Sequence, residues 1–240
     1  DSNQFKVEQG CRVSAEPYYQ NDLVTLYHGD CLEVDEWLAG DVLVTDPPYG
    51  SNNESRGTYS AEKGRTDRRR VSPIAGDRSP EQRDLVLTAW GGGPWIVFGT
   101  WRVPRPNGTD HRLIWHKTGA PPGPACSAFM LQDEEIYIHG KGFRASSPPM
   151  RSVIVTDEMR SGAAGAVATI GHPTPKPIRL MELLIDRCPQ GVIADPFAGS
   201  GSTLVAARNL GRKAIGVELE EKYCEIVARR LDQMCLDFGG

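Results

Sequence analysis

Short apolar segments alternate with helical patterns along most of the chain, and this alternation limits the possible folds more than any other feature. The segments VLV at 42–44 and VIA at 192–194 are apolar at successive positions, as in strands buried on both faces. Because parallel strands need a crossover helix between them, the alternation predicts a mainly parallel sheet with helices on both sides. We expect strands at 24–29, 41–45, 94–99, 111–116, 134–140, 191–196 and 213–219, and helices at 31–39, 79–90, 176–188, 201–210 and 221–234. A length of 240 residues suits a single doubly wound α/β domain spanning residues 1–240.

Two stretches lack this periodicity and predict irregular structure. Residues 50–78 are rich in Gly, Ser, Asn and Arg, which predicts a long mobile loop. Gly, Pro, Ala and Ser dominate most of 119–170, apart from the strand expected at 134–140, so we expect a small irregular insertion there. The first loop is basic although the whole chain carries a net charge of −4. Within it, the run from Arg56 to Arg70 has six cations against two acids, a local charge of +4, and the cations are Arg56, Lys63, Arg65, Arg68, Arg69 and Arg70.

The remaining composition excludes several classes of protein. The six cysteines are scattered and form no C-x-x-C pair, which argues against a zinc site and against a disulfide framework. No apolar run approaches the roughly 18 residues of a membrane span, and no signal-peptide pattern opens the chain. We therefore expect no metal, no membrane contact and a reducing cytoplasm.

Three of the expected strands end in an acidic residue: Asp46, Asp195 and Glu218. In an open α/β sheet, ligands bind beyond the carboxyl ends of the strands. A turn of small residues follows Asp195, in which Gly199 and Gly201 permit a tight bend and a close approach by a ligand. A carboxylate at the end of the following strand, here Glu218, commonly holds two ribose hydroxyls. No G-x-G-x-x-G and no Lys-Ser/Thr for a triphosphate are present, so the pattern predicts a nucleoside site; the alternative is an ordinary turn that binds nothing.

The sequence TDPPYG at 45–50 gives the strand expected at 41–45 an abrupt end. Pro47 and Pro48 remove two backbone donors, which leaves nearby carbonyls without competing partners. A free carbonyl beside the Asp46 carboxylate makes a pair of acceptors that suits an –NH₂ group, and Tyr49 offers a flat face for a base. Hydrogen bonds from both amine protons would restore the nucleophilicity of a conjugated amine. The alternative is a strand-terminating turn with a structural tyrosine.

Together, TDPPYG and ADPFAGSGST at 194–203 resemble the amino-methyltransferases that use S-adenosylmethionine to methylate exocyclic amines in DNA. The tetrapeptide precedes the Gly-rich turn by about 150 residues, an order that resembles the beta class of these enzymes. YHGDC at 27–31, GHPTPKPIRLMELLI at 171–185 and GVELEEKY at 216–223 extend the similarity over nearly the whole chain. The resemblance implies a Rossmann-like methyltransferase fold with a circularly permuted motif order and S-adenosylmethionine as the cofactor.

The resemblance also assigns roles to individual residues. It makes Asp46, Pro47, Pro48 and Tyr49 the catalytic tetrapeptide. It implies that Asp30 and Cys31 lie near the cofactor adenine, that Thr174 and Lys176 cap its methionine end, and that Glu218 holds its ribose. The rest of the implied cofactor site is the Gly-rich turn with its preceding strand end: Asp195, Phe197, Ala198, Gly199, Ser200 and Gly201. Two of these assignments have plain alternatives, since Lys176 can be a solvated helix start and Cys31 a small core residue.

The target is expected to be double-stranded DNA, although the chain leaves little room for the family's target-recognition region. Lys141 and Arg144 in the 119–170 insertion can contact phosphates, together with the basic loop, because phosphate contacts dominate affinity for DNA. The alternative for the loop is a solvated charged segment. Recognition of a short site, relaxed recognition, a homodimer that shares recognition, and a contribution from 50–78 all stay open. So do a restriction partner, a solitary regulator and a phage self-protection enzyme.

We therefore expect an enzyme that flips adenine out of the duplex and methylates its N6 amine directly. DPPY rather than SPPY favours adenine, and the first alternative is N4 methylation of cytosine. Methylation of RNA or of a protein amide is a second alternative, which the motif order disfavours. A nucleic-acid-binding protein without catalysis is a third, which the intact Asp46–Tyr49 and Gly-rich turn disfavour.

Overall fold

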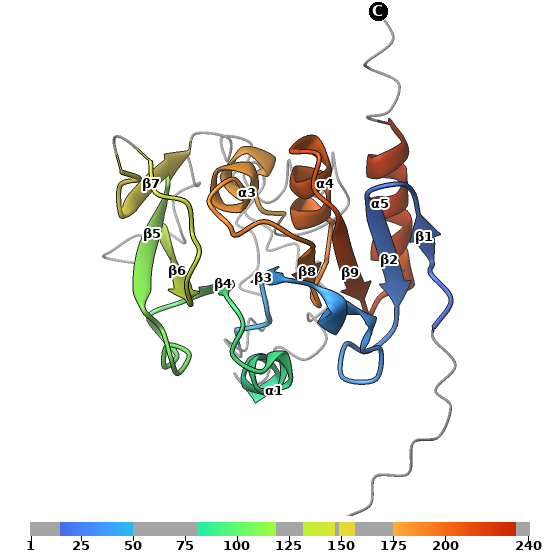
Figure 1. The fold of residues 1–240 in the computed structure, drawn as a ribbon, viewed down its shortest axis with the longest axis horizontal. Coiled ribbons are helices and arrows are strands. Elements are labelled where there is room, and N and C mark those ends of the chain that lie inside the picture. The colour runs from blue at the N-terminus through green and yellow to red at the C-terminus, as the bar shows by residue number, and fades with distance from the viewer. Residues whose placement is uncertain (1–14, 50–80, 119–131, 147–148, 157–174, 234–240) are drawn as a thin grey trace, which may run out of the picture.

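The computed structural model describes residues 15–49, 81–118, 132–146, 149–156 and 175–233, and within these ranges nine strands form one sheet. Figure 1 shows the sheet in cross-section, with the strands in the order β1-β2-β9-β8-β3-β4-β6-β5-β7. In chain order the strands are β1 (Tyr19–Gln20), β2 (Val24–His28), β3 (Val42–Thr45), β4 (Trp95–Gly99), β5 (His111–Lys117), β6 (Asp133–His139), β7 (Val153–Thr156), β8 (Ile193–Asp195) and β9 (Ala214–Glu218). The helices are η1 (Glu36–Ala39), α1 (Glu81–Trp90), α3 (Ile178–Ile185), α4 (Ser202–Asn209) and α5 (Glu221–Gln233).

Helices cover both faces of the sheet, as the sequence predicts. Figure 1 shows α3, α4 and α5 on one face, and α1 with η1 on the other. The buried strands alternate between the two layers: Val42 and Val44 pack into the core under α3, α4 and α5, whereas Leu43 packs into the core beside η1 and α1. This alternation follows from the two-residue period of a strand, and it explains why the central strands must be apolar at every position.

The strand order reverses between β8 and β3, and this reversal decides where a ligand can bind. From β8 the chain continues through α4 to β9 on one side, whereas from β3 it continues through α1 to β4 on the other. Strand β3 pairs in parallel with both β8 and β4, so their carboxyl ends lie at one edge. Crossovers that leave in opposite directions open a crevice at such a point. Asp46 and Asp195, which follow and end the two strands at the reversal, meet there.

The structure corrects the sequence-based prediction at three elements. The helix expected at 31–39 is a turn followed by the short 3-10 helix η1, because the Asp30 carbonyl and carboxylate accept the amides of Leu32, Glu33 and Val34 and close a local turn. Strand β1 is absent from the prediction, since its two residues form no pattern. Strand β7 lies where an irregular insertion was expected, and it pairs in parallel with β5 at the edge of the sheet.

Two further features refine the expected topology. Strand β6 runs antiparallel to both β4 and β5, and β1 runs antiparallel to β2, so the sheet is parallel only in its centre and at β5–β7. In the part of the chain that the structure describes, no helix is long and apolar enough to cross a membrane. The predicted loop at 50–78, and most of the 119–170 insertion apart from β6, β7 and their neighbours, lie outside the described residues.

Candidate active site

A cavity of about 330 Å³ opens at the carboxyl edge of the sheet, where the strand order reverses. Strands β2, β3, β8 and β9 all end at it, so segments far apart in the sequence contribute to one site. The residues of TDPPYG line one part, and the Gly-rich turn with the ends of β2 and β9 lines another. The arrangement confirms that the acidic strand ends share a site. Among the described residues, no three His, Cys, Asp or Glu side chains are arranged to hold a metal ion.

Asp46 lies at the start of the sharp exit from β3. Its Oδ1 accepts a hydrogen bond of 2.5 Å from the Tyr49 hydroxyl, which fixes the carboxylate relative to the ring. Among the described residues, none donates a hydrogen bond to the carbonyls of Pro47 or Pro48. Burial, and then the Asp46 charge, raises the pKa of Tyr49 well above its usual value, so this hydroxyl remains a donor. Within the described residues, the loop therefore presents a fixed carboxylate next to carbonyls that accept no hydrogen bond.

Lys176 lies inside the site, where its ammonium contacts the catalytic tetrapeptide. Its Nζ donates to Asp46 Oδ2, lies 3.1 Å from Glu134 Oε2, and lies 3.4 Å from the Tyr49 hydroxyl. The side chain is only 8% exposed, so the alternative of a solvated helix start is wrong. Burial alone would lower the pKa of Lys176, but the Asp46 and Glu134 carboxylates raise it above its usual value, so the ammonium stays charged. The predicted contact of Lys176 with the methionine end of the cofactor stays a prediction.

Glu134 and Lys117 complete this charged group, and the sequence analysis missed both. Glu134 is the second residue of β6, and its Oε1 accepts from the Lys117 ammonium at the end of β5. Burial would raise the pKa of Glu134, but Lys176 and Lys117 together lower it. Asp46, Lys176, Glu134 and Lys117 therefore form a row of alternating charges along the cavity wall. A lysine at the end of one expected strand and a glutamate at the start of the next are the only sequence signal for these two residues.

Glu218 ends β9 and lines the cavity with a side chain that backbone amides hold in place. Its Oε2 accepts from the Gly199 amide at 2.7 Å, and its Oε1 accepts from the Glu220 amide at 2.8 Å. Burial raises the pKa of this carboxyl above its usual value. A carboxylate has about four acceptor positions, so two remain for further donors such as hydroxyls. Asp30 lines the cavity close by, because the amide of the preceding Gly29 bonds to the Glu218 carbonyl.

Asp195 has a structural connection in addition to its place at the cavity. Its Oδ1 accepts from the Thr45 hydroxyl at 2.6 Å and from the Phe197 amide at 3.1 Å, which ties β8 to β3 at the strand reversal. The residue is only 2% exposed, and burial raises its pKa to about 6. The direct contact of Asp195 with the cofactor stays a prediction.

The two glycines of the turn after β8 serve different purposes. Gly199 has a φ of 52° and lines the cavity, where it gives its amide to Glu218. Gly201 has a φ of 78° and is not among the lining residues; a Cβ there would meet the Val227 side chain of α5 at 2.9 Å. Gly201 is therefore needed for the turn and for packing against α5, rather than for the approach of a ligand. The other expected residues of the turn, Phe197, Ala198 and Ser200, line the cavity.

Cys31 is a small core residue that also faces the cavity, and its place near the cofactor adenine stays a prediction. It belongs to the buried core beside η1. Burial raises the pKa of its thiol to about 12, so it offers a small neutral surface rather than a thiolate.

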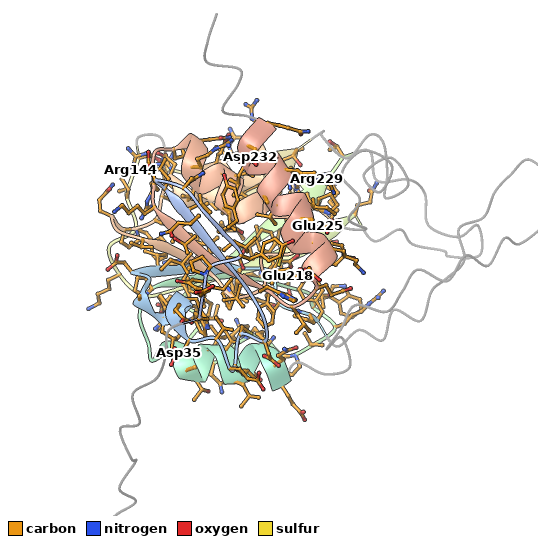
Figure 2. The ribbon with its side chains drawn as sticks, turned by 90° about the vertical axis from the view of Figure 1, so that its right-hand side faces the viewer. Asp35, Arg144, Glu218, Glu225, Arg229 and Asp232 are labelled. Carbon is orange, nitrogen blue, oxygen red and sulfur yellow. The ribbon has the colours of Figure 1, made fainter. Side chains whose placement is uncertain are left out.

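The described DNA-contact candidates, Lys141 and Arg144, lie at the opposite edge of the sheet from the cavity. Strand β6 begins at the cavity with Asp133 and Glu134 and runs for seven residues, about 20 Å at 3.3 Å per residue, before this segment starts. Arg144 pairs there with Asp186 of the turn after α3, and Figure 2 shows it well apart from Glu218. Neither residue therefore lines the cavity, and their contact with DNA phosphates stays a prediction. The remaining predicted residues lie outside the described ranges: Thr174, Arg56, Lys63, Arg65, Arg68, Arg69 and Arg70.

Comparison with known proteins decides the family. The model of the N6/N4 DNA methylase family matches residues 105–229, which is just over half of the chain. The chain belongs to the N6/N4 family of DNA methyltransferases. This family uses S-adenosylmethionine, so the predictions of the reaction class and the cofactor are confirmed. The matched segment includes Glu134, Lys176, the Gly-rich turn and Glu218, whereas Asp46 precedes it.

Individual proteins in this family align over most of the chain. The putative methylase YubD of Escherichia coli (strain K12) is 30% identical over 224 residues, which cover 85% of this chain and 88% of YubD. The type II methyltransferase M.ScaI of Streptomyces caespitosus is 28% identical over 279 residues, covering 92% of this chain and 85% of M.ScaI. Both relatives extend across the tetrapeptide as well as the cofactor turn.

Solved structures of methyltransferases share the fold. The complex of M1.HpyAVI with S-adenosylmethionine superposes with a TM-score of 0.59 at 20% identity, covering 87% of this chain and all of that one. The cytosine-N4-specific PvuII methyltransferase superposes with a TM-score of 0.58 at 15% identity, covering 90% of this chain and 89% of that one. The Rossmann-like methyltransferase fold is thereby confirmed, and the fold alone does not distinguish adenine from cytosine as the target.

Proposed function

We propose that this DNA methyltransferase transfers the methyl group of S-adenosylmethionine to the N6 amine of adenine, which it flips out of the duplex into the cavity beside Asp46. One observation carries the proposal: the Asp46 carboxylate, locked by Tyr49, lies in the same cavity as the Glu218 edge. An amine held there is within the cavity that also takes the cofactor, so direct transfer needs no enzyme nucleophile. The DPPY form of the tetrapeptide, rather than SPPY, supports adenine over cytosine.

The residues at the Glu218 end of the cavity fit the cofactor. Glu218 keeps acceptor positions for ribose hydroxyls, Gly199 has no side chain to obstruct the approach, and Phe197 adds an apolar surface. Four carboxylates line the cavity near this end, which suits a cationic sulfonium: Asp30, Asp195, Glu218 and Glu220. When bound, the cofactor supplies an electrophilic methyl group.

The tetrapeptide prepares the amine to accept that group. An exocyclic base amine is a poor nucleophile because its lone pair is delocalised into the ring. A hydrogen bond from one proton to Asp46 and another to a free carbonyl of the Pro47–Pro48 segment holds the nitrogen in place and draws its protons aside. Tyr49 keeps the carboxylate in position through its hydroxyl. The chain's role is therefore to orient the amine.

We also propose that the basic run from Arg56 to Arg70 contacts DNA phosphates. It begins seven residues after Tyr49, which lines the cavity, so only a short length of chain separates the run from the site. Arg102 and Lys117 add positive charge to the lining of the same cavity. Phosphate contacts of this kind position the duplex without reading its sequence.

The proposal is tested by incubating the protein with tritiated S-adenosylmethionine and plasmid DNA, RNA or total protein in parallel. The DNA is then digested to nucleosides, which separates N6-methyladenine from N4-methylcytosine. We expect the label in N6-methyladenine. Label in N4-methylcytosine would refute the choice of base, and label confined to RNA or protein would refute DNA as the substrate.

Asp46→Ala is the matching test of the mechanism. We expect transfer to fall about 100-fold or more, the scale for loss of a positioning group, while cofactor binding persists. Asp46→Asn should also be poor, because its amide presents donors where the amine needs acceptors. Transfer near the wild-type rate in Asp46→Ala would contradict the assigned role.

A further inference from the structure

Both oxygens of the Asp46 carboxylate already accept hydrogen bonds from the protein. Its Oδ1 already accepts from the Tyr49 hydroxyl and its Oδ2 from the Lys176 ammonium. An ammonium is a stronger donor than a neutral amine, because charge-assisted hydrogen bonds are about twice as strong as neutral ones. Lys176 therefore competes with the target amine for the acceptor that the amine needs.

Glu134 is placed to relieve that competition. Its Oε2 lies 3.1 Å from the Lys176 Nζ, and its other oxygen, Oε1, accepts a hydrogen bond from Lys117. The Oε2 atom is buried, and no group in the described residues donates to it with hydrogen-bond geometry. The Oε2 atom of Glu134 can therefore accept a hydrogen bond from the Lys176 ammonium after a small movement.

The surroundings of Lys176 restrict where its ammonium can move. The Nζ lies 4.9 Å from the centre of the Phe98 ring and 5.7 Å from that of Tyr49, and the residue's own carbonyl is bonded to the Ser202 hydroxyl. With the side chain only 8% exposed, the ammonium cannot be released into water without rearrangement. A shift from Asp46 to Glu134 keeps the ammonium paired and buried.

We propose that Glu134 is a positioning residue that takes up the Lys176 ammonium when the target amine binds Asp46. Lys117 holds Glu134 in place for this purpose through its bond to Oε1. No covalent bond changes in this step; one buried ion pair tightens as another loosens. The inference rests on the proposed function, because it assumes that the amine binds Asp46.

The test compares Glu134→Gln with Glu135→Gln in the full chain. Glutamine keeps the shape but not the charge, so Asp46 becomes the only anion beside Lys176. We expect the single-turnover rate of total methyl transfer to DNA, at saturating cofactor and DNA, to fall about tenfold or more. The dissociation constants for cofactor and duplex should stay within about twofold of wild type, because Glu134 acts on the amine rather than on either ligand's main contacts.

Glu135 is a matched control on the same strand. It is 5% exposed and bonds Arg112 and Tyr137, but it is not among the residues that line the cavity. Its substitution measures the general cost of removing a buried carboxylate from β6, and transfer should stay near the wild-type rate. Glu134→Asp adds a second comparison, since it restores the charge on a shorter side chain and should recover part of the rate lost in Glu134→Gln.

Three results would overturn the inference. These are a Glu134→Gln rate within about threefold of Glu135→Gln, a cofactor affinity that falls in parallel with the rate, and a Glu134→Asp rate no better than that of Glu134→Gln. Total transfer is measured, so a wild-type enzyme that labels cytosine would refute the adenine proposal while the Glu134 comparison still holds.

Discussion

Replacing Lys176 with methionine should destabilise the fold far more than most lysine substitutions. The ammonium contacts Asp46 and Glu134 from a side chain that is 8% exposed, so its loss leaves Asp46 without this cation and Glu134 with Lys117 alone. Methionine fills a similar volume, which keeps the packing against Phe98 and isolates the effect of the charge.

The structure gives the scale of the effect. At an effective dielectric constant of about 20, unit charges 3.1 Å apart attract by about 5 kcal/mol, and Lys176 has this attraction to Glu134 in addition to Asp46. The cost of burying the ammonium offsets part of that gain, so we expect Lys176→Met to lower the free energy of unfolding by about 3–5 kcal/mol, the range for removing one partner of a buried pair.

The pH dependence of this loss identifies its cause. In the wild-type protein the pKa of Glu134 is lowered, chiefly through Lys176 once burial is overcome, so this carboxylate adds stability above its unfolded pKa and loses it as the pH falls. Without Lys176 the pKa of Glu134 rises, and keeping the carboxylate ionised in the fold becomes costly. The stability lost in Lys176→Met should therefore be larger at pH 7 than at pH 4.

Urea unfolding of both proteins at several pH values measures this difference, with Lys222→Met as the control. Lys222 pairs with Glu220 from a side chain that is 53% exposed, and such exposed pairs contribute about 1 kcal/mol or less. A loss of less than about 1 kcal/mol in Lys176→Met, or a loss that does not grow with pH, would refute the argument that this ion pair is buried and essential.

Three further predictions follow from the cofactor edge, the strand reversal and the basic run. Glu218→Ala should weaken binding of S-adenosylmethionine by about 1.5–3 kcal/mol, roughly ten- to over a hundredfold in the dissociation constant, and unchanged affinity by calorimetry would place the ribose elsewhere. The pKa of Asp195 is raised from 3.8 to about 6, so ionising this carboxyl lowers the stability of the fold as the pH rises between these values. In urea titrations, the stability of Asp195→Asn relative to wild type should therefore improve by up to about 3 kcal/mol from pH 4 to pH 7. A constant difference would contradict the raised pKa. The third change replaces four arginines of the basic run with alanine: Arg65, Arg68, Arg69 and Arg70. The slope of log affinity for DNA against log salt concentration should become shallower by about 0.9 per lost phosphate contact, while cofactor binding is unaffected. An unchanged slope would assign the run to a solvated loop.

The sequence predicted the central strands and most helices because their signals are local. A strand buried on both faces must be apolar at each position, and VLV at 42–44 and VIA before Asp195 satisfy that condition without reference to any other segment. The helix α5 has an apolar stripe of its own, which contains Cys224, Val227 and Leu231. Where local bonds compete with such a pattern, as at Asp30 before η1, the prediction was wrong.

The sequence by itself also determined the motifs of the site: Asp46 to Tyr49 after one strand, the Gly-rich turn after another, and Glu218 after a third. Only the tertiary structure decided what surrounds Asp46, because Lys176, Glu134 and Lys117 come from separate segments whose order in the sheet no local pattern specifies. The same holds for β7, whose pairing with β5 joins residues about 40 positions apart, and for Arg144, which the antiparallel direction of β6 carries to the far edge. Local sequence sets which residues end a strand, whereas pairing between distant strands sets which of those ends meet and which charges must then neutralise one another.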